Sequence, residues 1–116
     1  MESCDSILVS IKKMLGMTEE YTVFDPDIIM HINTVFGTLR QMGVGPSDGF
    51  AIENKDAVWT DFIHDSDIVK FNAVKTYMYL KVKLIFDPPL SGTTIGVYNE
   101  SIKEMEWRLN VEAESD

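Results

Sequence analysis

Apolar residues recur at three- and four-residue intervals in four separate segments of the 116-residue chain. This spacing places apolar side chains on one face of an α-helix, whereas a half-buried strand alternates at every second residue. The pattern therefore predicts an all-α fold with four helices. The predicted helices cover residues 5–15, 26–42, 67–86 and 94–110.

The ends of these helices carry recognisable start and stop residues. Asp25-Pro26-Asp27 is a strong start signal for the second helix, because an Asp cap, an early proline and a first-turn acid all favour a helix N-terminus. Gly16 and Gly43 suit the left-handed conformation that ends a helix. Asp5 or Ser6 is expected to cap the first helix, and Thr93 or Thr94 the last.

Gly37 stands inside the second predicted helix, where glycine is unfavourable. We expect it to allow a neighbouring backbone to come close.

The third predicted helix is apolar on nearly all sides, which is typical of a central helix or of one shared with a subunit interface. From Ile68 to Phe86 it contains four lysines and no acid, although the chain as a whole is acidic. Their stems could cover apolar surface while their ammonium groups stay in water. Alternatively, some of them form ion pairs with acids of a neighbouring subunit. These lysines are Lys70, Lys75, Lys81 and Lys83.

A long connection separates the second and third helices. Residues 43–49 contain three glycines and a proline and are predicted to be a loop. Residues 50–52 and 57–59 could then pair as a small β-hairpin or simply brace the loop. The acidic tail, residues 111–116, is expected to fray.

Composition and charge limit the class of protein. The chain is 45% hydrophobic and 25% charged, as expected for one globular domain. No apolar run reaches the ~18 residues that cross a bilayer, so we expect no membrane association. The single Cys4 excludes an intrachain disulfide. A formal charge of -9 argues against a freestanding protein that binds by neutralising phosphates, but not against a place beside DNA in a larger assembly.

Catalytic motifs are missing from the sequence. It has neither a phosphate-binding nor a dinucleotide-binding glycine motif, and no His-Glu-x-x-His. His31 and His64 are far apart without a third ligand at metal spacing, and Cys4 has no base beside it. We therefore expect no enzymatic activity, no cofactor and no metal.

Aromatic residues indicate an interaction surface instead. Trp107 lies next to the apolar seam of the last helix and precedes Arg108, and both residue types are enriched at interface hot spots. Trp107 could equally cover the edge of its own core. Phe50 and Trp59 bracket the long connection and raise the same question.

Several short stretches together resemble the head–tail connector (adaptor) family of tailed phages, in particular connectors of siphophages that infect Gram-positive bacteria. The run that ends Phe-Asp-Pro-Pro is the most specific of them, and the region between Phe50 and Trp59 looks like an insertion relative to the simplest members. The stretches are Leu15-Gly16-Met17, Asp25-x-Asp27-Ile28-Ile29, Ile32-Asn33, Leu39-x-x-Met42-Gly43, residues 74–89 and residues 104–110.

This resemblance implies a structural protein of the virion neck, assembled in the host cytoplasm, with residues 1–116 as one connector domain. Connectors of this kind form a ring, commonly of twelve subunits, that docks beneath the portal protein. The ring extends the channel toward a stopper or head-completion protein and the tail, and double-stranded DNA passes through without sequence-specific binding. By resemblance, the C-terminal helix meets the portal, with Trp107, Arg108 and Leu109 as candidate anchors.

Two other classes remain as alternatives. A small acidic regulator, or a DNA mimic, would occupy a basic site on a host enzyme. A metal- or carboxylate-dependent hydrolase would instead need a pocket that joins His31 or His64 to two acids.

Overall fold

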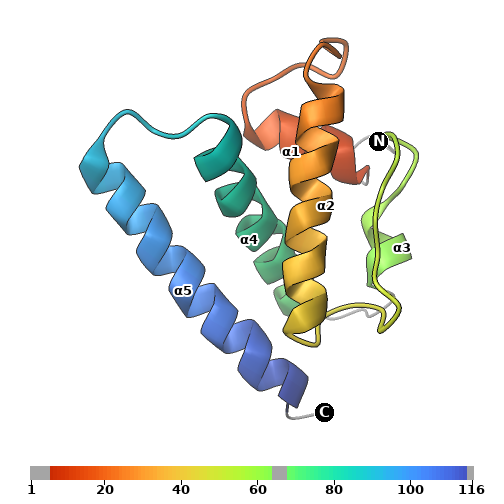
Figure 1. Ribbon diagram of the computed structural model, residues 1–116, viewed down its shortest axis with the longest axis vertical. Helices are drawn as coiled ribbons and strands as arrows, with labels where there is room; N and C mark the ends of the chain where they lie inside the picture. Colours follow the sequence, from red (N-terminus) through yellow and green to blue (C-terminus); the bar gives the residue numbers. More distant parts are fainter. Residues whose placement is uncertain (1–5, 64–67, 115–116) are drawn as a thin grey trace.

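The computed structural model describes residues 6–63 and 68–114, which fold into α-helices and connecting loops without a β-strand (Figure 1). The all-α prediction is therefore confirmed. No helix in this part of the chain is both long and apolar enough to span a bilayer. The helices are α1 (Ile7–Met14), α2 (Asp25–Gln41), α3 (Trp59–Phe62), α4 (Ile68–Phe86) and α5 (Gly92–Glu114).

Helix α4 lies between α2 and α5 and runs antiparallel to both, while α1 crosses one end of α2 and α4 (Figure 1). The molecule is flat, with extents of 40 × 35 × 23 Å, so α5 forms one edge and packs mainly on α4. Burying the apolar faces of α1, α2 and α4 against one another removes most of their apolar surface from water. The most buried residues of these helices include Ile7, Ile11, Ile28, Ile32, Val35, Phe36, Leu39, Val74, Tyr77, Met78 and Val82.

The long connection between α2 and α4 contains the short helix α3 instead of a β-hairpin. Ile52 bonds to the side-chain amide of Asn33 on α2: its N–H donates to Oδ1 at 2.8 Å and its carbonyl accepts from Nδ2 at 3.0 Å. The carbonyl of Ala57 accepts from the N–H of Ile7 at 3.0 Å. The two halves of the expected hairpin thus bond to α2 and to the start of α1, and not to each other.

Two helix starts differ from the predictions. Ser6 caps α1 by accepting a hydrogen bond from the N–H of Val9 at 3.2 Å, as expected for one of the two candidates. For α5, however, the Ser91 hydroxyl accepts from the N–H of Thr94 at 3.3 Å, so neither threonine is the cap. Asp25 is the first residue of α2 instead of its cap, and its carboxylate pairs with Lys12 on α1.

The predicted stop residues adopt the expected conformation, since Gly16 and Gly43 have φ angles of +84° and +85°. The expectation for Gly37 is wrong. It is exposed on α2, and a Cβ placed there would meet no atom within 4 Å.

Helix α5 is longer than predicted, because residues 111–114 remain helical instead of fraying. Its last turns pack back onto the molecule. Leu109 is buried, and the Cβ of Ala113 lies 3.3 Å from the position a Cβ would take on Gly43 at the end of α2. Residues 115 and 116 lie outside the described part.

Candidate interaction surfaces

Helix α5 has two faces of different character. Its inner face contains the buried residues Ile102 and Leu109 and packs on α4. Its outer face presents Val97, Trp107 and Val111 to solvent, and the Trp107 side chain is 65% exposed. Large exposed apolar side chains on one helix face mark interaction sites more often than isolated ones do.

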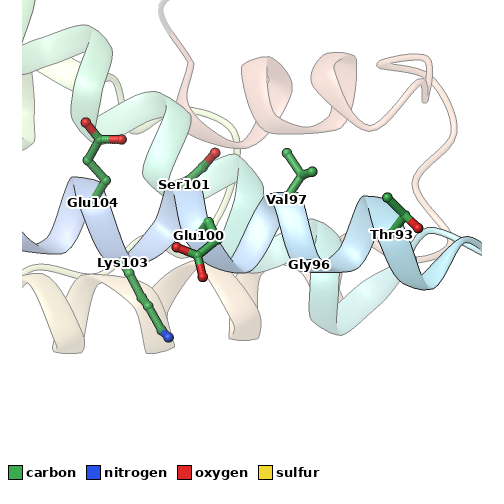
Figure 2. Close-up of a pocket in the computed structure, with 7 residues that line it drawn as sticks. All are labelled: Thr93, Gly96, Val97, Glu100, Ser101, Lys103 and Glu104. Carbon is green, nitrogen blue, oxygen red and sulfur yellow. The ribbon is translucent and has the colours of Figure 1, made fainter.

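A shallow hollow lies on the same outer face, toward the start of α5 (Figure 2). Gly96 supplies no side chain, and a Cβ there would meet no atom within 4 Å, which leaves this stretch of the helix open. Figure 2 shows that Val97, Ser101 and Glu104 project from one side of α5 and Lys103 from the other. A partner helix could approach the α5 backbone closely at this point.

Charges on the outer face are partly compensated within α5. Arg108 Nη2 donates to Glu104 Oε2 at 2.6 Å, and both side chains are exposed. The second pair at ion-pair spacing, Glu100 and Lys103, forms no salt bridge among the described residues. Exposed pairs of this kind contribute little to stability, so Glu104 and Arg108 remain available to a partner.

The other predicted interface residues are not exposed in the same way. Leu109 is only 1% exposed, and Trp59 is equally buried, with its Nε1 donating to Ser10 Oγ at 2.9 Å. Phe50 is half-buried and packs edge-on against Phe36 with 5.0 Å between ring centroids. Of the sequence candidates, Trp107 and Arg108 are therefore the ones that a partner can reach directly.

The described lysines of α4 contact groups within the chain. The Lys75 ammonium lies 5.7 Å from the ring centroid of Trp59, and that of Lys81 lies 5.9 Å from the ring of Tyr77. Lys83 Nζ lies 2.9 Å from Asp87 Oδ2, one turn further along the chain. The Lys70 side chain is outside the described part.

Sequence reasoning missed a hydrogen bond that joins α4 to α5. The buried Tyr77 hydroxyl donates to Glu106 Oε2 at 2.8 Å. Burial raises the pKa of Tyr77 well above its ordinary range, and the hydrogen bond and negative charge of Glu106 raise it further. Tyr79 also bonds to Tyr98 of α5, and this bond, with partial burial, raises the pKa of Tyr79 to about 12.

A second missed feature is Lys12, which is only 1% exposed. Its ammonium lies 2.9 Å from Asp25 Oδ1 and donates to the carbonyl of Glu19 at 3.1 Å. This pair forms the base of a cleft of about 460 Å³ between α1, the start of α2 and residues 53–55. We call it the α1–α2 cleft; Leu8, Val9 and Ile29 line it.

An aromatic cluster covers the end of the molecule where α2 begins and α4 ends. Phe24 contacts Tyr21 and Phe86 edge-on, with ring centroids 6.0 Å and 5.4 Å apart, and His31 lies 6.4 Å from Phe86. His31 thus belongs to a packing cluster. Among the described residues, no group of three or more His, Cys, Asp or Glu side chains is placed to hold a metal ion. His64 and Cys4 lie outside those residues.

Residues 7–116 match the model of a family described as phage connector protein. No curated protein and no solved structure matches the chain.

Proposed function

The chain belongs to the phage connector family, whose members are structural components of the virion at the head–tail junction, and from this we propose that it forms a ring beneath the portal protein. The ring, a dodecamer, extends the DNA channel toward the stopper or head-completion protein and the tail. It assembles in the host cytoplasm. Family membership favours this structural role over an acidic regulator and over a hydrolase. We also propose that residues 1–116 form one connector domain, since the described helices share one core.

The outer face of α5 is the observation that carries the portal contact. It combines an exposed tryptophan with a nearby arginine, two residue types that dominate binding energy at interfaces. The inner face of the same helix is fixed by core packing, so the outer face is presented to a partner in a fixed orientation. Leu109 supports this surface from inside the core instead of contacting the portal.

Net charge supports the channel role. Each copy carries a formal charge of -9, and a ring multiplies it. Carboxylates that line a channel repel DNA phosphates, so that the duplex can slide without sticking. Inter-subunit ion pairs with Lys70, Lys75, Lys81 and Lys83 would relieve part of the repulsion between neighbouring copies.

Substitution of Trp107 tests the portal contact. We expect Trp107→Ala to weaken binding to the cognate portal protein about 30-fold, the loss typical of a hot-spot residue, as measured by surface plasmon resonance. Its unfolding midpoint in urea should be unchanged because the side chain is exposed.

Two further variants control this experiment. Val23→Ala removes an equally exposed apolar side chain from the α1–α2 connection and should leave portal binding intact. Leu109→Ala should lower the free energy of unfolding by about 2–4 kcal/mol, because it creates a cavity beneath the same surface. Unchanged portal affinity for Trp107→Ala would remove the assignment of α5 to the portal.

A further inference from the structure

The connection between α4 and α5 presents a large apolar side chain that none of the described residues covers. Leu90 is fully exposed, and Ile85 in the last turn of α4 is half exposed. Pro88 and Pro89 precede Leu90 and fix the backbone, because each proline ring locks its own φ angle. The two prolines therefore reduce the backbone entropy that the segment leading to Leu90 loses on binding.

The α1–α2 cleft offers space and apolar walls for such a side chain. At about 460 Å³ it lies within the size range of protein binding pockets. Its apolar walls come from Leu8, Val9 and Ile29, and the charges at its base are already paired, Lys12 with Asp25. An apolar side chain can thus enter without leaving a buried charge unpaired.

Charge around the two features is also complementary. The mouth of the cleft carries Glu19 and Glu53, with Lys55 only 3.7 Å from Glu19, and the exposed Glu20 follows in the chain. The segment from Lys81 to Leu90 carries two lysines and Asp87, which pairs with Lys83, so its net charge is +1. The residues that line the cleft have a net charge of -1, and opposite net charges favour association, so the positively charged segment that bears Leu90 complements the cleft.

We propose that Leu90 of one copy inserts into the α1–α2 cleft of a second copy, with the basic end of α4 facing the acidic mouth. The proposal rests on the ring proposed above and specifies which surfaces join its subunits. The α4–α5 connection and α1 with residues 53–55 lie on different sides of the molecule (Figure 1). A contact between two different surfaces repeats from copy to copy and closes into a ring when the rotations between copies add up to a full turn, whereas a self-complementary contact stops at a dimer.

Disulfide cross-linking tests the pairing directly. In a Cys4→Ser background, the double variant Leu90→Cys/Ile29→Cys allows a disulfide between position 90 of one copy and the cleft wall of the next. Assembled with the portal protein and mildly oxidised, it should give a ladder of covalent oligomers larger than a dimer. The control Leu90→Cys/Gln41→Cys places the second cysteine on an exposed position at the other end of α2 and should give no product larger than a dimer.

A charge introduced at position 90 provides a second test of the contact. Leu90→Asp alters a fully exposed residue, so the helical circular dichroism signal should stay unchanged while self-association weakens at least about tenfold in sedimentation velocity. Gln41→Asp, at an exposed position at the far end of α2 and outside both proposed surfaces, should leave self-association within about twofold of the parent.

The outcomes separate this inference from the ring itself. If rings form on the portal in electron micrographs but the ladder is missing, or if Leu90→Asp assembles normally, the Leu90 contact is wrong and the ring stands. If the parent chain does not assemble at any concentration, alone or with portal, both proposals are wrong.

Discussion

At the scale of single residues, the ion pair between Lys12 and Asp25 joins three segments that are separate in the sequence. It holds the last turn of α1, the carbonyl of Glu19 in the connection and the first residue of α2 together. A lysine that is almost fully buried is stable only because these oxygens replace the water it has lost. The pair therefore fixes how the chain turns from α1 into α2.

Removal of the lysine charge should destabilise the fold. We expect Lys12→Met to lower the free energy of unfolding by about 2–3 kcal/mol, because the Asp25 carboxylate loses its counter-charge. The value lies below the roughly 3–5 kcal/mol expected for fully buried pairs, since a fifth of the Asp25 side chain is exposed. Urea unfolding measures it. Lys13→Met, at the exposed neighbouring position, should change stability by less than about 0.5 kcal/mol; equal losses would contradict the role given to Lys12.

The tyrosines that join α4 to α5 predict a dependence of stability on alkaline pH. Tyr77 and Tyr79 have raised pKa values in the folded chain, so folding favours their protonated forms. Their contribution is complete below pH 10, the ordinary tyrosine pKa, and the part due to Tyr79 is lost as pH rises from 10 to about 12. The free energy of unfolding should fall over this interval.

Urea titrations at a series of pH values measure this fall. Tyr79→Phe keeps the ring but cannot ionise, so its stability should decline less steeply than that of the parent. Parallel declines in the two proteins would show that another group is responsible.

Sequence patterns predicted some residue roles and missed others for a physical reason. Ser6, Gly16 and Gly43 act within one turn of their own positions, and local spacing is enough to identify such roles. Lys12 gave a partial signal, because it follows Leu8 by four positions and so shares the apolar face of its helix. Its partner Asp25 is brought close only by the path of the connection, which spacing does not contain.

At the scale of helices, two glycines of the α2 region should respond in opposite directions to alanine. Gly37→Ala should stabilise the chain by up to about 1 kcal/mol, because alanine is the better helix former and its Cβ meets nothing within 4 Å. Gly45→Ala should destabilise it, since a Cβ there would overlap the Phe62 ring and the φ angle is +91°.

Thermal or urea unfolding of the two variants checks this pair of predictions. A loss of stability in Gly37→Ala would contradict the prediction and would mean that glycine at this exposed position stabilises the monomer. Stabilisation together with impaired assembly would instead place a neighbouring copy against this face of α2.

Helix α5 shows where the sequence interpretation fell short. Trp107 stands two positions from both Met105 and Leu109, and two positions turn a helix by more than half a circle, so Trp107 faces away from the seam. The alternative that it covers the edge of its own core is wrong. Trp59 differs because it belongs to the α2–α4 connection, which packs it against Ser10 of α1 and Phe36 of α2, and no periodicity within one helix predicts such burial.

At the scale of the whole molecule, fold class and family could be predicted from the chain, while the arrangement of the helices could not. Residues 7–116 match the connector family, as the dispersed stretches indicated. The flat packing with α5 on one edge depends on which apolar faces meet, and those faces look alike in the sequence.

Net charge gives a prediction at this scale. With a formal charge of -9, the isolated chain should not retard double-stranded DNA in a gel at physiological salt, because the protein and the DNA are both negatively charged. A retarded band that weakens as salt is added would contradict an acidic lining of the channel.

The edge position of α5 also has an evolutionary consequence. Because this helix is anchored through its inner face, substitutions on its outer face leave the core untouched and are close to neutral for folding. Lineages can therefore vary Trp107 and its neighbours as the opposing protein varies, while the buried residues stay under selection for packing. We expect partner specificity in such connectors to diverge faster than the fold.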